Sequence, residues 1–143
     1  MNSNKDLDAI IAFKTKTEIL FHPIDNYEPM QIEDKIKRYI QTKLEQYAIK
    51  ATIIDIVLVG SRCRGLETEY SDLDFVVEFS TEEREDVLFS ILNEDCIHFN
   101  DIPVDINPIT AQRTGTLSTY LPKVEEYLSK KKEALEPELL ELE

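Results

Sequence analysis

The sequence has few of the residues that make covalent or metal cross-links: two cysteines and two histidines among 143 residues. Cys63, Cys96, His22 and His98 show neither metal-ligand spacing nor a disulfide framework. Long hydrophobic runs are also absent, because the most apolar stretch, residues 53–59, contains an aspartate and falls far short of the ~18 residues of a membrane span. No secretory signal is visible at the N-terminus. These absences argue against a membrane or disulfide-rich secreted protein and predict a cytoplasmic one.

Positive charge is scarce as well, with 16 basic against 29 acidic side chains and a net charge of −13. Residues 62–105 hold 3 basic and 13 acidic groups, a net charge of −10. Nucleic-acid backbones are bound by Lys and Arg that displace counterions, so a nucleic-acid partner is unexpected. A local surplus of carboxylates is the expected surrounding of a hard divalent cation. A solvated acidic surface nevertheless explains most of these groups.

The remaining composition, 42% hydrophobic and 31% charged residues, is that of a globular protein. We expect a single domain over residues 1–143, with a core at about 50–130, an N-terminal helix and connector over 1–30 and an acidic tail at 133–143.

Hydrophobic periodicity predicts both helices and strands, an α/β (α+β) fold. The apolar positions of the first helix are Leu7, Ile10, Ile11 and Ile19, and Thr81 is the expected N-cap of the third. A basic helix face around Lys35–Lys43 is interpreted as solvated. The predicted helices cover residues 7–20, 31–50, 82–94 and 117–128, and the predicted strands cover 52–59, 73–79 and 102–106.

The chemically informative stretch begins where the first strand ends, at Gly60-Ser61-Arg62-Cys63-Arg64-Gly65. A tight turn at Gly60 exposes backbone N–H groups, which together form an anion-binding nest. Ser61 adds a hydroxyl, and the guanidinium groups of Arg62 and Arg64 suit phosphate oxygens. Arg62 is equally compatible with a surface salt bridge, and Cys63 is interpreted as a small structural residue. The loop therefore predicts phosphate binding.

Two aspartates follow on the second strand. Asp72 and Asp74 are two residues apart, so both carboxylates should share one face while Leu73 and Phe75 face the core. Carboxylates held side by side repel unless a cation lies between them, and Mg²⁺ binds one or two carboxylates together with substrate phosphates. An exposed edge-strand pair is the alternative interpretation.

A third carboxylate, Asp105, lies between Val104 and Ile106, which should face the core. Aspartate is disfavoured inside a strand, and a metal shared with the first two would give it a partner. A hydrogen-bonded turn is the alternative. Three carboxylates and two cations beside a phosphate nest suit in-line displacement at phosphorus. Asn107 and Arg113 follow the third strand, where each could reach phosphate or acceptor.

The pattern Gly60-Ser61, Asp72-Leu73-Asp74 and Asp105 resembles the signature of the DNA polymerase β-like nucleotidyltransferase superfamily. It is most similar to the minimal nucleotidyltransferases, small stand-alone members often paired with a separate helical partner protein. It also resembles nucleotidyltransferase-like modules of the polyvalent proteins of phages and conjugative elements. The resemblance covers about residues 50–130 and implies a nucleotidyltransferase fold, with a small mixed sheet of about 3–5 strands flanked by helices.

The resemblance also implies an activity: transfer of a nucleoside monophosphate, AMP from ATP, to a hydroxyl acceptor. It implies two Mg²⁺ ions, replaceable by Mn²⁺, held by the catalytic residues Asp72, Asp74 and Asp105. The implied nucleotide-binding residues are Gly60, Ser61, Arg64 and Ser71.

The acceptor stays open at this stage among a protein side chain, a small hydroxylated molecule and a nucleic-acid 3′ end. We favour a protein, which could dock near residues 117–128 unless that face is buried in the protein's own core. The alternative function is a catalytically inactive nucleotide-binding or acidic, DNA-mimic-like interaction module of a mobile element. The complete signature argues against inactivity.

Overall fold

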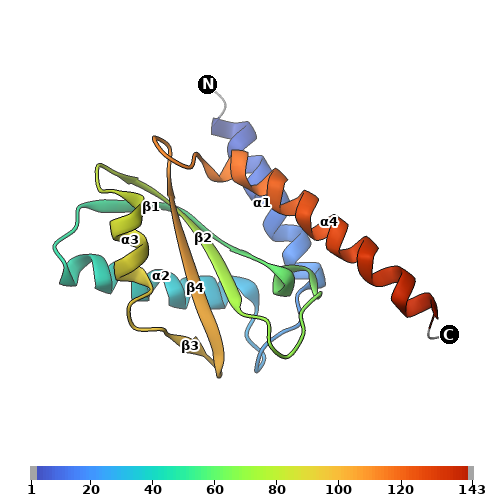
Figure 1. Ribbon diagram of the computed structural model, residues 1–143. Coiled ribbons are helices and arrows are strands. Elements are labelled where there is room, and N and C mark those ends of the chain that lie inside the picture. Colours follow the sequence, from blue (N-terminus) through green and yellow to red (C-terminus); the bar gives the residue numbers. More distant parts are fainter. Residues whose placement is uncertain (1–2, 142–143) are drawn as a thin grey trace.

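The computed structural model describes the backbone of residues 3–141 and the side chains of residues 7–134. Within these residues, four helices surround a four-stranded mixed sheet, which is the α+β fold predicted from periodicity (Figure 1). The elements are α1 (Ser3–Leu20), α2 (Pro29–Gln46), β1 (Ala51–Val59), the short 3₁₀ helix η1 (Ser61–Arg64), β2 (Leu73–Thr81), α3 (Glu85–Leu92), β3 (His98–Phe99), β4 (Ile102–Thr110) and α4 (Leu117–Glu141).

The strands are ordered β1-β2-β4-β3. β1 and β3 run antiparallel to their neighbours, whereas β2 and β4 are parallel and connected through α3. Because β2 and β4 are parallel and start at the same edge of the sheet, the first residues of the two strands lie side by side. This edge also receives the C-terminal end of β1, since Val59 pairs with Asp74.

Helices α2 and α3 cover one face of the sheet, and α1 and α4 lie on the other (Figure 1). The α2/α3 face is fully apolar along β2, where Leu73, Phe75 and Val77 are completely buried. On the α1/α4 face, Val76 is buried, and the carboxylate of Glu78 accepts a hydrogen bond of 2.9 Å from the first N–H of α4, at Leu117. That contact fixes where α4 crosses the sheet.

A buried carboxylate also fixes the outer edge of β1. The Leu58 N–H points away from β2 and donates to Glu33 of α2 at 2.9 Å. Glu33 is 5% exposed and lies 3.7 Å from the Lys14 ammonium. Burial raises the pKa of Glu33 to about 7 against the lowering effect of Lys14. The exposed edge of the sheet is thereby capped by a side chain rather than left open.

Three local expectations were wrong. Of the four apolar positions expected for the first helix, Ile10 is buried, but Leu7, Ile11 and Ile19 are exposed. The buried stripe instead continues from Ile10 through Phe13 and Thr17 to Phe21, just after the end of α1. Thr81 ends β2 and donates to the Lys50 carbonyl, so α3 begins later, at Glu85. Lys43 is buried in ion pairs with Glu94 and Asp95 rather than solvated.

At the C-terminal end, α4 continues through most of the expected acidic tail as far as Glu141, and residues 142–143 lie outside the described part. None of the helices in residues 3–141 combines the length and apolar character required to cross a bilayer.

Candidate active site

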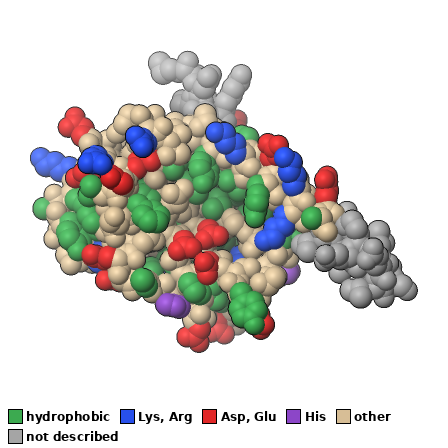
Figure 2. Space-filling model, in the orientation of Figure 1, with side chains coloured by type: hydrophobic (Ala, Val, Ile, Leu, Met, Phe, Trp, Pro, Cys, Tyr) green, Lys and Arg blue, Asp and Glu red, His purple; other side chains and the backbone are tan. Residues whose placement is uncertain are grey.

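The three predicted carboxylates meet at the edge where β2 and β4 begin. Asp74 and Asp105 occupy paired positions of the two parallel strands, and Asp72 immediately precedes β2. One oxygen from each carboxylate lies within 4.8 Å of the others. Figure 2 shows a group of acidic side chains in the middle of this face, with hydrophobic side chains beside it and Lys or Arg side chains to its right.

Burial and mutual repulsion both disfavour the charged forms of this triad. Burial, followed by the charges of Asp105 and Asp72, raises the pKa of Asp74 to about 6. Burial and contact with Asp72 likewise raise the pKa of Asp105. Lys131 of α4 partly compensates at Asp74. An all-oxygen donor set with excess negative charge suits a hard divalent cation such as Mg²⁺, so the residues fit the implied metal.

Gly60 is required by the packing of the triad. Its φ is +78°, a conformation that residues with a Cβ rarely adopt. A Cβ at this position would overlap with Oδ2 of Asp74. The glycine therefore permits β1 to turn into η1 directly against the carboxylates.

The loop around η1 holds the remaining predicted phosphate ligands. The first hydrogen bond of η1 runs from the Cys63 N–H to the Gly60 carbonyl, so the N–H groups of Ser61 and Arg62 precede the intrahelical bonds. The Ser61 hydroxyl donates to that of Ser71 at 3.2 Å, and Arg62 Nε donates to the Ser71 carbonyl at 2.9 Å. These contacts join the loop before β2 to the turn after β1.

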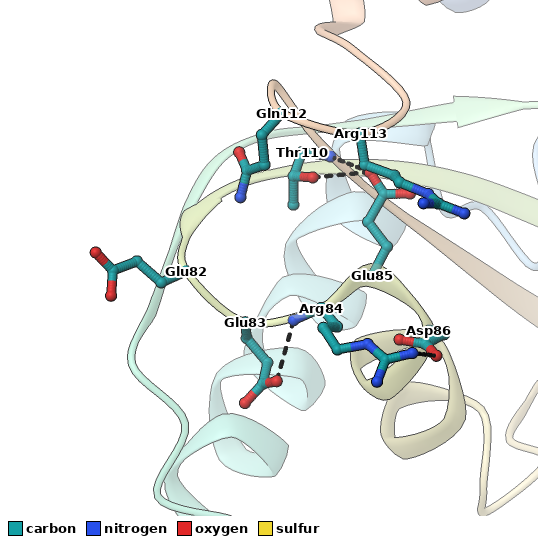
Figure 3. A pocket seen from close by; sticks show the side chains of 8 residues that line it. All are labelled: Glu82, Glu83, Arg84, Glu85, Asp86, Thr110, Gln112 and Arg113. Carbon is teal, nitrogen blue, oxygen red and sulfur yellow. Dashed lines mark hydrogen bonds and ion pairs between the residues drawn. The ribbon is translucent and has the colours of Figure 1, made fainter.

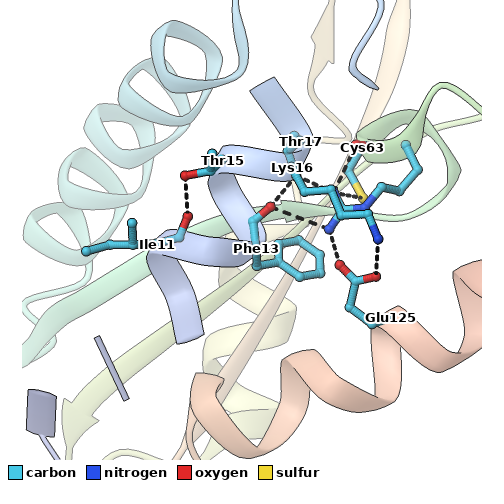
Figure 4. A network of polar contacts seen from close by, with 8 residues as sticks. Ile11, Phe13, Thr15, Lys16, Thr17, Cys63 and Glu125 are labelled. Carbon is cyan, nitrogen blue, oxygen red and sulfur yellow. Dashed lines mark hydrogen bonds and ion pairs between the residues drawn. The ribbon is translucent and has the colours of Figure 1, made fainter. Parts of the chain in front are cut away.

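Arg64 departs from its predicted role as a phosphate ligand. Its side chain is 4% exposed, and its guanidinium is directed into the interior, where it donates to the Thr17 hydroxyl at 2.5 Å and pairs with Glu125 of α4. It also stacks 4.2 Å from the Phe13 ring centroid. Figure 4 shows Phe13, Thr17 and Glu125 converging on this position from α1 and α4. Because the two terminal nitrogens have these partners and the side chain is buried, Arg64 attaches η1 to two helices and does not face a triphosphate at the triad.

Cys63 agrees with its structural interpretation. Its side chain is completely buried, and burial raises the pKa of the thiol to about 12. A thiol in this state is not a nucleophile at neutral pH.

A pocket of about 500 Å³ adjoins the triad between the sheet and α4. Asp74 and Asp105 line it together with Asn107. The α4 residues of this wall, Tyr120, Lys123 and Tyr127, were not predicted as site residues, because their helical spacing alone could not distinguish a core face from a pocket wall. The leucines of the same helix, Leu117, Leu121 and Leu128, are buried.

Arg113 lies elsewhere. It lines a second hollow, at the opposite ends of β2 and β4, together with Arg84 and Gln112 (Figure 3). In that hollow the carboxylate of Glu85 accepts hydrogen bonds from Thr110 and Thr114. These hydrogen bonds are those of a turn whose polar groups pair with one another. Because the hollow lies at the far ends of the strands, Arg113 cannot reach a phosphate bound at the triad.

Comparison with known families now decides the assignment. A family model described as a nucleotidyltransferase domain matches residues 33–140. The chain belongs to the nucleotidyltransferase family. The matched region of this nucleotidyltransferase runs from α2 into α4 and so includes the triad, Gly60 and the pocket wall. No curated protein and no solved structure gives a significant match.

Proposed function

We propose that this nucleotidyltransferase moves a nucleoside monophosphate, AMP from ATP, onto a hydroxyl group in a Mg²⁺-dependent reaction. The observation that supports this most directly is the convergence of Asp72, Asp74 and Asp105, with carboxylate oxygens within 4.8 Å of one another beside a glycine turn. Two bound Mg²⁺ ions would neutralise the charge on the attacking and leaving oxygens of an in-line displacement.

The chain's own residues have distinct parts in such a displacement. The acceptor oxygen forms a bond to the α-phosphorus while the bond from that phosphorus to the bridging oxygen breaks, and pyrophosphate leaves. Asp105 is the exposed member of the triad, so an acceptor hydroxyl can approach it, and its carboxylate favours loss of the hydroxyl proton. As ligands of the phosphate oxygens we propose the N–H groups that begin η1 and the Ser61 hydroxyl, which would exchange its hydrogen bond to Ser71 for one to phosphate.

A protein hydroxyl, from Tyr, Ser or Thr, is our proposed acceptor. The segment that contains the triad carries a net charge of −10, which opposes the approach of a long polyanion such as RNA. The carrier of that hydroxyl could be a helical partner protein, and a cytoplasmic location belongs to the same proposal.

The test is incubation with α-³²P-labelled ATP, Mg²⁺ and a cell extract. We expect label on a discrete protein band that resists nuclease. Label found only in RNA or only in small molecules would refute the protein acceptor while leaving nucleotidyl transfer intact.

Two substitutions separate the site from a general surface effect. Asp72→Asn should abolish labelling, whereas Asp101→Asn, in the exposed turn before β4, should label as wild type. Mg²⁺ should also raise the Tm of the wild type more than that of Asp72→Asn. Equal labelling by both variants would refute the catalytic assignment, and absence of any metal-dependent nucleotide binding by the wild type would favour an inactive interaction module.

A further inference from the structure

The pocket beside the triad is lined by apolar and aromatic residues that metal binding by the triad does not need. Its volume, about 500 Å³, lies within the range of ~300–1,000 Å³ typical of small-molecule sites. Asp74 and Asp105 form one end, so a group bound in the pocket is continuous with a phosphate held at the carboxylates. Apart from Lys123, the rest of the pocket is mainly apolar, which suits an uncharged part of a ligand better than a phosphate.

One helix face supplies the outer wall. Tyr120, Val124 and Tyr127 are separated by four and three residues, which places them on one side of α4. The opposite wall is the sheet surface at Val59 and Val76. Tyr127 lines this pocket and is 63% exposed although it is a large aromatic residue, so much of its surface is not covered by the protein itself. Flat apolar walls with aromatic rings favour a planar heteroaromatic group by stacking.

Asn107 provides a directional polar group inside this apolar surface. It lies two residues after Asp105 on β4 and therefore shares a face with that carboxylate. Its side-chain Nδ2 donates to the Tyr120 hydroxyl oxygen at 3.3 Å. This contact uses one of the two N–H groups of the amide and turns Nδ2 toward Tyr120, which leaves Oδ1 as an acceptor suited to an exocyclic amino group.

We propose that this pocket binds the nucleobase of the triphosphate and that Asn107 selects bases with an exocyclic amino group, adenine before hypoxanthine. The inference rests on the proposed function, since it requires a nucleoside triphosphate at the triad. Tyr127 stacks on the base, and Tyr120 positions the Asn107 amide. The competing occupant of the pocket is the acceptor.

Binding of two matched ligands by calorimetry tests the selection. The α,β-methylene analogues of ATP and inosine triphosphate differ at the purine 6-position, amino in one and oxo in the other, and neither can be turned over. In the presence of Mg²⁺ we expect the wild type to bind the ATP analogue about tenfold more tightly, the ratio that one hydrogen bond provides. Inorganic tripolyphosphate reports binding at the triad without a base.

Variants locate the discrimination. Asn107→Leu should bind both analogues equally, and Tyr120→Phe should reduce the ratio because the amide loses its orienting partner. Tyr127→Ala should weaken both analogues about tenfold while leaving tripolyphosphate binding unchanged. Phe89→Ala, an exposed aromatic on α3 across the sheet, is the matched control and should change none of these affinities. A Tm within a few degrees of wild type confirms folding of each variant.

The outcomes distinguish this inference from the proposed function. A preference for the ATP analogue that disappears in Asn107→Leu supports the pocket assignment. Equal binding of the two analogues by the wild type, or a preference that survives in Asn107→Leu, overturns it while leaving nucleotidyl transfer in place. If neither the analogues nor tripolyphosphate bind with Mg²⁺, both the inference and the proposed function fail.

Discussion

The two faces of the sheet are built from the same strands but differ in how completely helices cover them. On β2, Phe75 and Val77 point into the layer of α2 and α3 and have no exposed surface. The alternating residues Asp74 and Val76 point to the other side, where α4 covers Val76 but leaves Asp74 half-exposed. One face is therefore a core along its whole length, whereas the other is a core at one end and a candidate active site at the other.

A carboxylate with a raised pKa lies at the outer edge of β1 and another on the face covered by α4, and the two differ in their partners. Burial is the main cause at both Glu33 and Asp74. Glu33 has the Lys14 ammonium and the Leu58 N–H as partners, which offset only part of the cost of burying its charge. Asp74 lies beside two further carboxylates, whose negative charges add to the cost of ionising it. A carboxylate with an N–H donor and an ammonium beside it can serve as a cap of a strand edge, whereas three adjacent carboxylates form a candidate site for a cation.

The largest effect on stability is expected from loss of an aromatic side chain on the face of the sheet that α2 and α3 cover completely. Phe75→Ala removes a completely buried ring and should lower the free energy of unfolding by about 4 kcal/mol, through lost burial and the cavity left behind. Urea denaturation measures this loss. Phe89→Ala, 52% exposed, should cost less than about 1 kcal/mol. Equal losses in the two variants would contradict the assignment of a closed core face.

The next effect concerns pH and the Glu33 carboxylate. Its pKa rises from 4.5 unfolded to about 7 folded, so the folded state binds the proton more tightly. The resulting stability is fully present below pH 4.5 and is lost as the pH rises through 7, by on the order of 3 kcal/mol.

Glu33→Gln cannot lose this proton and keeps an acceptor for the Leu58 N–H. The stability of the variant, measured by urea denaturation from pH 5 to 8, should therefore fall less with pH than that of the wild type. Parallel curves for the two proteins would show that Glu33 does not titrate as its burial implies.

A smaller effect is expected at the contact that joins η1 to α1 and α4. Arg64→Lys keeps the charge but loses the planar fork that reaches Thr17 and Glu125 together, and should cost about 2 kcal/mol. Arg84→Lys, in an exposed ion pair with Asp86, should cost less than about 0.5 kcal/mol. If Arg64→Lys unfolds at the same urea concentration as the wild type, the buried contact is not a structural anchor.

The smallest effect on stability is expected at the triad, on the face of the sheet that α4 covers only in part. The same change should have the largest effect on activity. Asp74→Asn removes one of three repelling charges, so without metal its Tm should equal or slightly exceed that of the wild type. Transfer should nevertheless be abolished. Thermal denaturation with and without Mg²⁺ provides the readout. Strong destabilisation by this substitution would show that the carboxylate is a structural residue.

The burial of a strand residue that depends only on alternation with its immediate neighbours was predicted correctly from the sequence. Alternation along β2 and β4 placed Leu73, Phe75 and Ile106 in the core, and they are buried. The same alternation placed the aspartates together, because neighbouring strands bring equivalent faces into register. The family signature then named the fold. These are consequences of strand geometry with a period of two, which the sequence carries explicitly.

Only the tertiary structure decided which partner each long or amphipathic side chain takes. Arg64 looked like a phosphate ligand, but α1 and α4 offer Thr17 and Glu125 on its other side, and those contacts depend on residues 47 and 61 positions away. The exposed apolar residues of α1 and the open aromatic face of α4 have the same origin. A helix shows which residues share a face, but the packing of distant elements determines whether that face meets a core, a neighbour or a ligand.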